Sequence, residues 1–149
     1  MALIFRDAVQ VDLPALVAML TDDPLGQGRE GTDMAPYLAA FDEIAANPMH
    51  QLIVAELDGR IVATCQLTIL AGLSRQGAKR ALVEAVRVAG DLRSQGIGAA
   101  LMVECETRAR AAGAGVLQLT TDKSRLRAHA FYDRLGFVAS HIGYKKTLV

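Results

Sequence analysis

The run 86–98, Val-Arg-Val-Ala-Gly-Asp-Leu-Arg-Ser-Gln-Gly-Ile-Gly, passes from a strand pattern into a glycine-punctuated turn that opens a predicted helix. Backbone N–H groups at a helix N-terminus lack partners inside the helix, and the helix dipole adds positive charge there, so such a turn is suited to bind a phosphate. Gly98 is not followed by the Lys-Ser/Thr of a P-loop, and Leu101 stands where a dinucleotide fingerprint has Gly or Ala. The run therefore indicates an anion site of another kind, or a turn whose glycines serve backbone geometry alone.

Glu84 lies just before this run, in a strand predicted over about residues 81–88. In regular alternation its side chain shares a face with Leu82, Val86 and Val88, where a carboxylate would be unusual. Desolvation there would raise the pKa of the carboxyl group toward a value useful to a general base. A salt-bridged or edge-exposed glutamate, or one acting through water, is the alternative interpretation.

Tyr132 is a candidate general acid in the predicted last helix. Phe131 and Leu135 recur at core spacing, whereas Tyr132 shares a different face with Arg125 and His129. A tyrosine that only packs is the alternative, and His129 either contacts a ligand or is solvated.

Composition describes an ordinary globular chain of 149 residues, 52% hydrophobic and 21% charged. Sixteen basic and sixteen acidic residues cancel, so no global field points to nucleic acid or to an anionic membrane. Charged residues interrupt the apolar N-terminal stretch, and we expect neither secretion nor membrane insertion but a cytoplasmic location.

Cysteine and histidine usage predicts no metal site. Cys65 and Cys105 fall in a predicted strand and a predicted helix without metal-ligand spacing, and are interpreted as reduced core residues. The three histidines are widely separated.

The elements that must position these residues form one predicted domain over residues 1–149. The pattern is of class α/β (α+β), with a mixed sheet of six to seven strands flanked by about four helices. Asp12 is expected to cap the first helix, residues 22–32 to form an irregular loop, and Ser124 to cap the last helix. The predicted strands are about 3–6, 52–57, 60–70, 81–88, 116–121 and 137–148, and the predicted helices are about 13–20, 33–47, 97–112 and 124–135.

This order of elements, with three motifs, resembles the GNAT superfamily of N-acetyltransferases over essentially the whole chain. Residues 6–16 resemble its first strand and helix. The spacing Arg93-x-x-Gly96-x-Gly98 matches its cofactor motif, Arg/Gln-x-x-Gly-x-Gly/Ala, and residues 131–137 match its Phe-Tyr-x-x-Leu-Gly-Phe ending. The resemblance implies acetyl-CoA as cofactor and direct acetyl transfer to an amine, and a homodimer is common in similar proteins.

The resemblance also implies roles for individual residues. Backbone N–H groups of residues 95–99 would hold the pyrophosphate, and Arg93 would add charge. The pantetheine arm would pair with the backbone of residues 86–88, and the Val88 N–H would donate to the thioester oxygen. The implied cofactor set is Val86, Arg87, Val88, Arg93, Ser94, Gln95, Gly96, Ile97, Gly98, Ala99, Ser124, Arg127, His129 and Tyr132.

One departure concerns an Asn that many members carry early in the last helix segment. This chain has an arginine-rich stretch there, and Ser124 or Arg127 would substitute for the Asn contact.

The acceptor site is expected at the loop of residues 22–30, whose glycines suggest mobility and whose carboxylates would attract a cationic amine. A solvated loop with no specific contact is the alternative. The expected acceptor-binding residues are Asp23, Leu25, Arg29, Glu30 and Glu84. The leading hypothesis is an enzyme that acetylates a small-molecule amine. The alternatives are an enzyme that acetylates a protein N-terminus or lysine, and a non-catalytic sensor that binds acyl-CoA.

Overall fold

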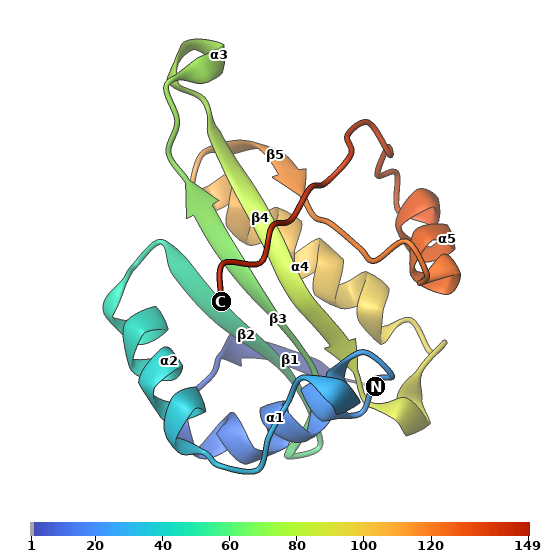
Figure 1. Ribbon diagram of the computed structural model, residues 1–149. Coiled ribbons are helices and arrows are strands. Elements are labelled where there is room, and N and C mark those ends of the chain that lie inside the picture. The colour runs from blue at the N-terminus through green and yellow to red at the C-terminus, as the bar shows by residue number, and fades with distance from the viewer. Residues whose placement is uncertain (1) are drawn as a thin grey trace. The chain divides into compact units, whose positions relative to one another are not determined.

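The computed structural model describes residues 2–149 (Figure 1). The chain divides into two compact units, Met1–Gln118 and Leu119–Val149, and each is described by itself.

The first unit is built on a five-stranded sheet in the order β1-β2-β3-β4-β5. Neighbouring strands are antiparallel from β1 to β4, and β5 is parallel to β4. The β2–β3 hairpin turns at Asp58-Gly59, both with positive φ, as expected for an Asp-Gly turn. The strands are β1 (Leu3–Asp7), β2 (His50–Leu57), β3 (Arg60–Leu70), β4 (Lys79–Val88) and β5 (Ala114–Gln118).

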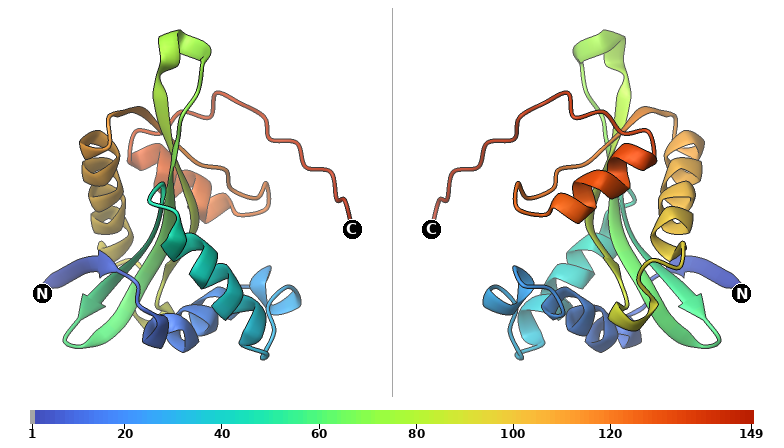
Figure 2. Two further views of the ribbon diagram at one scale, coloured as in Figure 1. Left: turned by 90° about the vertical axis from the view of Figure 1, so that its left-hand side faces the viewer. Right: turned by 90° about the vertical axis from the view of Figure 1, so that its right-hand side faces the viewer.

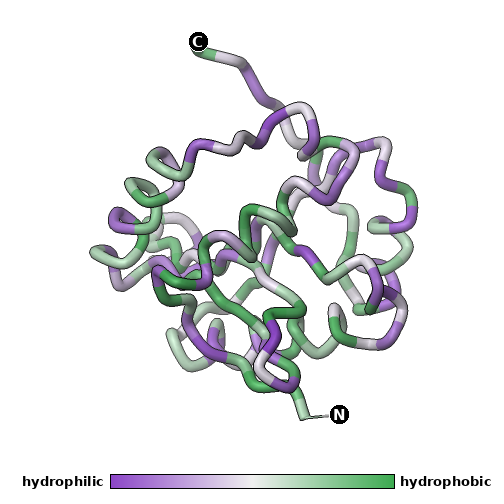
Figure 3. Tube along the Cα trace, turned by 90° about the horizontal axis from the view of Figure 1, so that it is seen from below, coloured by the Kyte–Doolittle hydropathy of each residue, from purple (hydrophilic) through white to green (hydrophobic). Residues whose placement is uncertain are grey.

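Helices cover both faces of this sheet (Figure 2). On one face Leu13 and Leu16 pack against Val54, and on the other the Sγ atoms of Cys65 and Cys105 lie 3.4 Å apart in the buried core. Hydropathy alternates within the helices of the trace, as expected when one helix face is buried (Figure 3). The helices are α1 (Leu13–Thr21), α2 (Ala35–Ala46), α3 (Ser74–Gly77) and α4 (Ile97–Ala111), with 3₁₀ turns η1 (Gln10–Asp12), η2 (Gly26–Gly28) and η3 (Gly90–Leu92).

Asp12 does not cap α1 with its side chain. Its carboxylate accepts hydrogen bonds from the Val9 N–H at 2.8 Å and from the Arg6 guanidinium at 2.7 and 3.1 Å. The expected cap is therefore wrong, because a cation on β1 and the preceding turn engage this carboxylate instead.

The second unit contains α5 (Leu126–Arg134), and Gly136, two residues after its end, has a φ of +90°. Ser124 is not its side-chain cap, because the Ser124 N–H and hydroxyl both bond to Asp122 Oδ1, at 2.9 and 2.6 Å. Among the described residues, 137–149 form neither helix nor strand.

The predicted sheet of six to seven strands is thus corrected to five, because a strand needs a hydrogen-bonded neighbour and residues 137–149 have none in a ladder. Five helices replace about four, since the loop before β4 contains the short α3, in which Arg75 and Gln76 have left-handed φ. The expected loop of residues 22–32 contains η2.

Within residues 2–149, no helix has the length and apolar character needed to span a bilayer. Nor do three or more His, Cys, Asp or Glu side chains gather there as a metal ion would require.

Candidate active site

The pairing of β4 with β3 contains a bulge next to the predicted base. Gln66 lies opposite Glu84 but Thr64 lies opposite Arg87, so Cys65 faces two residues, Ala85 and Val86. Ala85 has a φ of +53°, which an alanine rarely adopts. Pairing with β5 ends at Leu82 and Gln118, whereas β4 continues for six more residues to Val88. The edge of β4 facing away from β3 is therefore free of β5 after Leu82.

The bulge also changes which side chains share a face with Glu84. Directly opposite residues point to the same face, and Thr64, Gln66 and Thr68 alternate along β3 on the α1 face. Glu84 therefore shares its face with Leu82 and Arg87, not with Val86 and Val88. The prediction from regular alternation was wrong here, because the extra residue shifts the register by one.

Glu84 is exposed, and the row beside it on β3 is polar. The burial expected for this carboxylate is not found.

The Val88 N–H points to the open edge of β4. The Ala89 N–H donates to the Val62 carbonyl at 2.8 Å, which makes these two a hydrogen-bonded pair. In an antiparallel ladder the next pair, Val88 with Ala63, directs its N–H and C=O groups away from each other. A backbone donor thus lies where β5 no longer pairs.

The N-terminus of α4 forms a cradle of backbone donors. Gly96 is the N-cap residue with a φ of +82°, and Ser94 has a φ of +65°. Because glycine has no side chain, Gly96 cannot cap the first N–H groups of α4 with one. A Cβ on Gly96 would meet nothing within 4 Å, so space is open beside it. This arrangement suits an anion such as a pyrophosphate.

The end of α1 contacts both arginines of this region. Asp23 accepts a hydrogen bond from Arg87 Nη2 at 3.3 Å, and both side chains are 9% exposed. The Asp22 carbonyl accepts one from Arg93 Nη2 at 3.2 Å. The second Arg87 nitrogen, Nη1, donates to the Val86 carbonyl at 2.9 Å.

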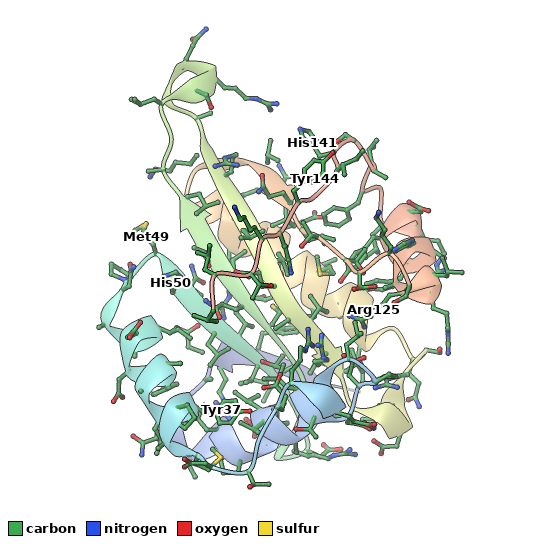
Figure 4. All side chains as sticks on the ribbon, viewed as in Figure 1. Tyr37, Met49, His50, Arg125, His141 and Tyr144 are labelled. Atoms are coloured by element: carbon green, nitrogen blue, oxygen red, sulfur yellow. The ribbon has the colours of Figure 1, made fainter. Side chains whose placement is uncertain are left out.

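The loop expected to be mobile is tightly built at its start. A Cβ on Gly26 would lie 1.9 Å from the Leu20 carbonyl oxygen, so only glycine fits there. Tyr37 of α2 (Figure 4) donates to Glu30 Oε1 at 2.8 Å and accepts from the Gly31 N–H at 3.0 Å. Leu25 and Arg29 are exposed, and Arg29 lies 3.8 Å from Asp23.

Sequence reasoning missed Tyr37 and the polar row of β3, and it included Asp22 in the acceptor loop without its contact to Arg93. His50, labelled in Figure 4 at the start of β2, lies across from Thr68, and its Nδ1 is 3.1 Å from the Thr68 Oγ1. Strand alternation could have found the row, since Thr64, Gln66 and Thr68 are spaced by two. No local pattern indicates the contacts of Tyr37 or Asp22.

In the second unit, Tyr132 belongs to an aromatic cluster. Its ring meets those of Phe131 and Phe137 edge to face, with centroids 5.1 and 5.6 Å away. The expected separation of Tyr132 from the packed face is thus not found. The His129 Nε2 lies 2.9 Å from the Asp122 carbonyl oxygen, and Arg127 is exposed. The hydrogen bonds from Ser124 hold the pKa of the Asp122 carboxyl below its usual range.

The fold is that of a known enzyme class. Residues 14–137 match the model of the Acetyltransferase (GNAT) family, and the chain belongs to this family. It is an acetyl-CoA-dependent acetyltransferase acting on amines, and the open cradle at α4 and the free Val88 edge fit that cofactor.

Proteins similar to this chain include the following three. A solved structure from Bacillus halodurans C-125, described as a transcriptional regulator, is 41% identical, with a TM-score of 0.95, covering 99% of this chain and 100% of that one. A putative acetyltransferase from Agrobacterium tumefaciens str. C58 is 27% identical, with a TM-score of 0.87, covering 97% and 99%.

The third is the aminoalkylphosphonate N-acetyltransferase of Salmonella typhimurium (strain LT2), which is 42% identical over 57 residues. That match covers 38% of this chain and 37% of the relative.

Proposed function

We propose that the protein moves an acetyl group from acetyl-CoA to a primary amine of a small molecule by direct attack on the thioester. The observation that carries this proposal is the bulge, because it places an exposed carboxylate, Glu84, three residues before an arginine on the same face of an opened sheet. The exposed position leaves the carboxylate accessible to a cationic amine.

The chain's own residues would hold the cofactor in two places. Backbone N–H groups of residues 95–99 would bind the pyrophosphate at the α4 N-terminus, with Arg93 adding charge after release from Asp22. The backbone of residues 86–88 would pair with the pantetheine arm along the free edge. Ser124, Arg127, His129 and Tyr132 remain proposed contacts from the second unit.

Each catalytic group then has a defined task. Acetyl-CoA, when bound, supplies the acetyl group as an activated thioester. The Val88 N–H donates to the carbonyl oxygen as negative charge develops there. Glu84, directly or through water, takes a proton from the ammonium form of the amine, which cannot attack while protonated. The Tyr132 hydroxyl gives a proton to the thiolate that leaves as the C–N bond forms and the C–S bond breaks.

The acceptor class is supported by charge and by one relative. Asp23, Leu25, Arg29 and Glu30 lie on the loop that we propose as its binding site, and the Salmonella relative is named for aminoalkylphosphonates. We therefore place aminoalkylphosphonates first in a panel with amino acids, polyamines and amine-bearing antibiotics.

The test follows thiol release from acetyl-CoA across this panel. Glu84→Gln and Tyr132→Phe should each lower kcat on the best acceptor roughly 100-fold, the scale of general acid–base catalysis. Glu43→Gln on the exposed side of α2 is the matched control and should keep the wild-type kcat. Full kcat in both active-site variants would contradict the assignments.

A non-catalytic acyl-CoA sensor is the second candidate, because the Bacillus halodurans structure is described as a transcriptional regulator. Tight acetyl-CoA binding without turnover on any amine or peptide would favour it. Turnover on peptides alone would favour a protein acetyltransferase.

We also propose that the chain forms a single domain over residues 1–149, that it is located in the cytoplasm and that it forms a homodimer. The family model crosses from the first unit into the second, which supports the single domain.

A further inference from the structure

The free edge of β4 lacks the support that a strand normally receives from both neighbours. After Leu82, no ladder to β5 holds the strand within the first unit, and Ala85 adopts a left-handed φ. Residues 86–88 nevertheless carry the backbone donor proposed for the thioester. On the other side β3 pairs with this segment at Arg87 and Val88, so within the sheet of the first unit the strand is supported from one side only.

The Arg87 side chain bridges the backbone of residue 86 and the carboxylate of Asp23. Its Nη1 binds the Val86 carbonyl at 2.9 Å and its Nη2 binds Asp23 Oδ2 at 3.3 Å. A planar guanidinium presents these two donors in a fixed geometry, which a lysine ammonium does not reproduce. The bridge therefore ties the backbone of the bulged strand to the loop that follows α1.

Asp23 holds the other end of the bridge. It is 9% exposed, like Arg87, and a buried ion pair is costly unless both charges are well bonded. The Asp23 carbonyl also accepts the Gln27 N–H at 2.9 Å, and glycine alone fits at Gly26, so the loop that carries Asp23 is itself fixed.

We propose that Asp23 is a positioning residue for the thioester site, acting through Arg87 on the backbone of residues 86–88 so that the Val88 N–H is aimed at the acetyl carbonyl. This inference rests on the proposed role of Val88. It assigns the carboxylate of Asp23 to orienting the cofactor site rather than to binding the amine.

The test reads the carbonyl directly and needs no acceptor. Difference infrared spectroscopy of [1-¹³C]acetyl-CoA bound to the wild-type protein should show the thioester carbonyl stretch at lower frequency than in water. Asp23→Asn and Arg87→Lys should lose most of this shift, and kcat on the best amine should fall roughly 10- to 100-fold, as expected for a misplaced catalytic group.

Two controls separate positioning from folding. The double variant Asp23→Leu/Arg87→Met removes both buried charges, so its Tm should exceed that of Asp23→Asn, yet the carbonyl shift should stay lost. Asp91→Asn breaks the exposed Arg60–Asp91 pair of the same unit, 54% and 61% exposed, and should keep the wild-type shift.

A wild-type shift in Asp23→Asn and Arg87→Lys would overturn the inference, as would a double variant that regains the shift together with its Tm. If Asp23→Asn fails to fold, the carbonyl shifts of Arg87→Lys and of the double variant still test the inference. Wild-type protein that binds acetyl-CoA without any shift would instead refute the role of Val88, and this inference with it.

Discussion

At the scale of single residues, backbone geometry explains why the anion cradle needs glycine. Gly96 has a φ of +82° with open space where a Cβ would stand, so conformation rather than packing selects it. Gly98 follows as the second residue of α4, where we propose that the backbone meets the pyrophosphate.

Gly98→Val should weaken acetyl-CoA binding about tenfold or more, the value of one lost hydrogen bond to a charged group, because its side chain would block the phosphate. Isothermal calorimetry measures this, and circular dichroism should show the fold intact. Gly115→Val is the matched control, because a Cβ on Gly115 meets nothing within 4 Å and Gly115 lies on β5 rather than at the α4 N-terminus. Equal affinities in wild type and Gly98→Val would rule the cradle out.

At the scale of elements, an ion-pair cluster joins β1, β2 and the turn before α1. Arg6 contacts Asp12 at 2.7 Å and Glu56 at 2.9 Å. The hydrogen bond from Arg6, with that from the Val9 N–H, holds the pKa of the Asp12 carboxyl below its usual value, although burial opposes the shift.

A carboxyl group whose pKa is lower in the folded state stabilises the fold above its unfolded pKa of about 3.9, and this contribution disappears as pH falls through the folded pKa. Asp12→Asn should therefore lower the free energy of unfolding by about 1–3 kcal/mol at pH 7. Urea unfolding from pH 7 to pH 2 should show the two proteins converging below about pH 4. A constant difference across that range would contradict the assignment.

At the scale of the whole molecule, the match to the family model spans both of the compact units into which backbone contacts divide the chain. The model covers residues 14–137, whereas the compact units meet at Gln118 and Leu119. A single domain should unfold as one cooperative transition.

Hydrogen exchange followed by mass spectrometry under strongly destabilising conditions tests this. Peptides from β3 and from α5 should pass from protected to exchanged in one step with a common rate, because their global unfolding is shared. Two separate steps would show that the second unit is an independent folding unit.

The sequence by itself determined the enzyme class and predicted a donor site, because each inference depends on contiguous residues. The turn at residues 93–98 leads into α4 as predicted, and the motif at residues 131–137 includes the end of α5 and the glycine that follows it. Core positions such as Cys65 and Cys105 also follow from local periodicity, and their burial is confirmed.

Tertiary structure decided the environment of the catalytic candidates. Regular alternation predicted that Glu84 lies in an apolar row of β4. In the structure Ala85 is the extra residue of a bulge, and Glu84 lies beside the polar side chains of β3. No glycine or proline signals this bulge, because register is set between strands rather than along one. Likewise Asp23 and Arg87, which form an ion pair, are 64 residues apart. Residues 137–149 have a strand-like composition but form no strand, because they have no partner strand in a ladder. Contacts between segments distant in sequence have no local pattern, and only the folded chain brings them together.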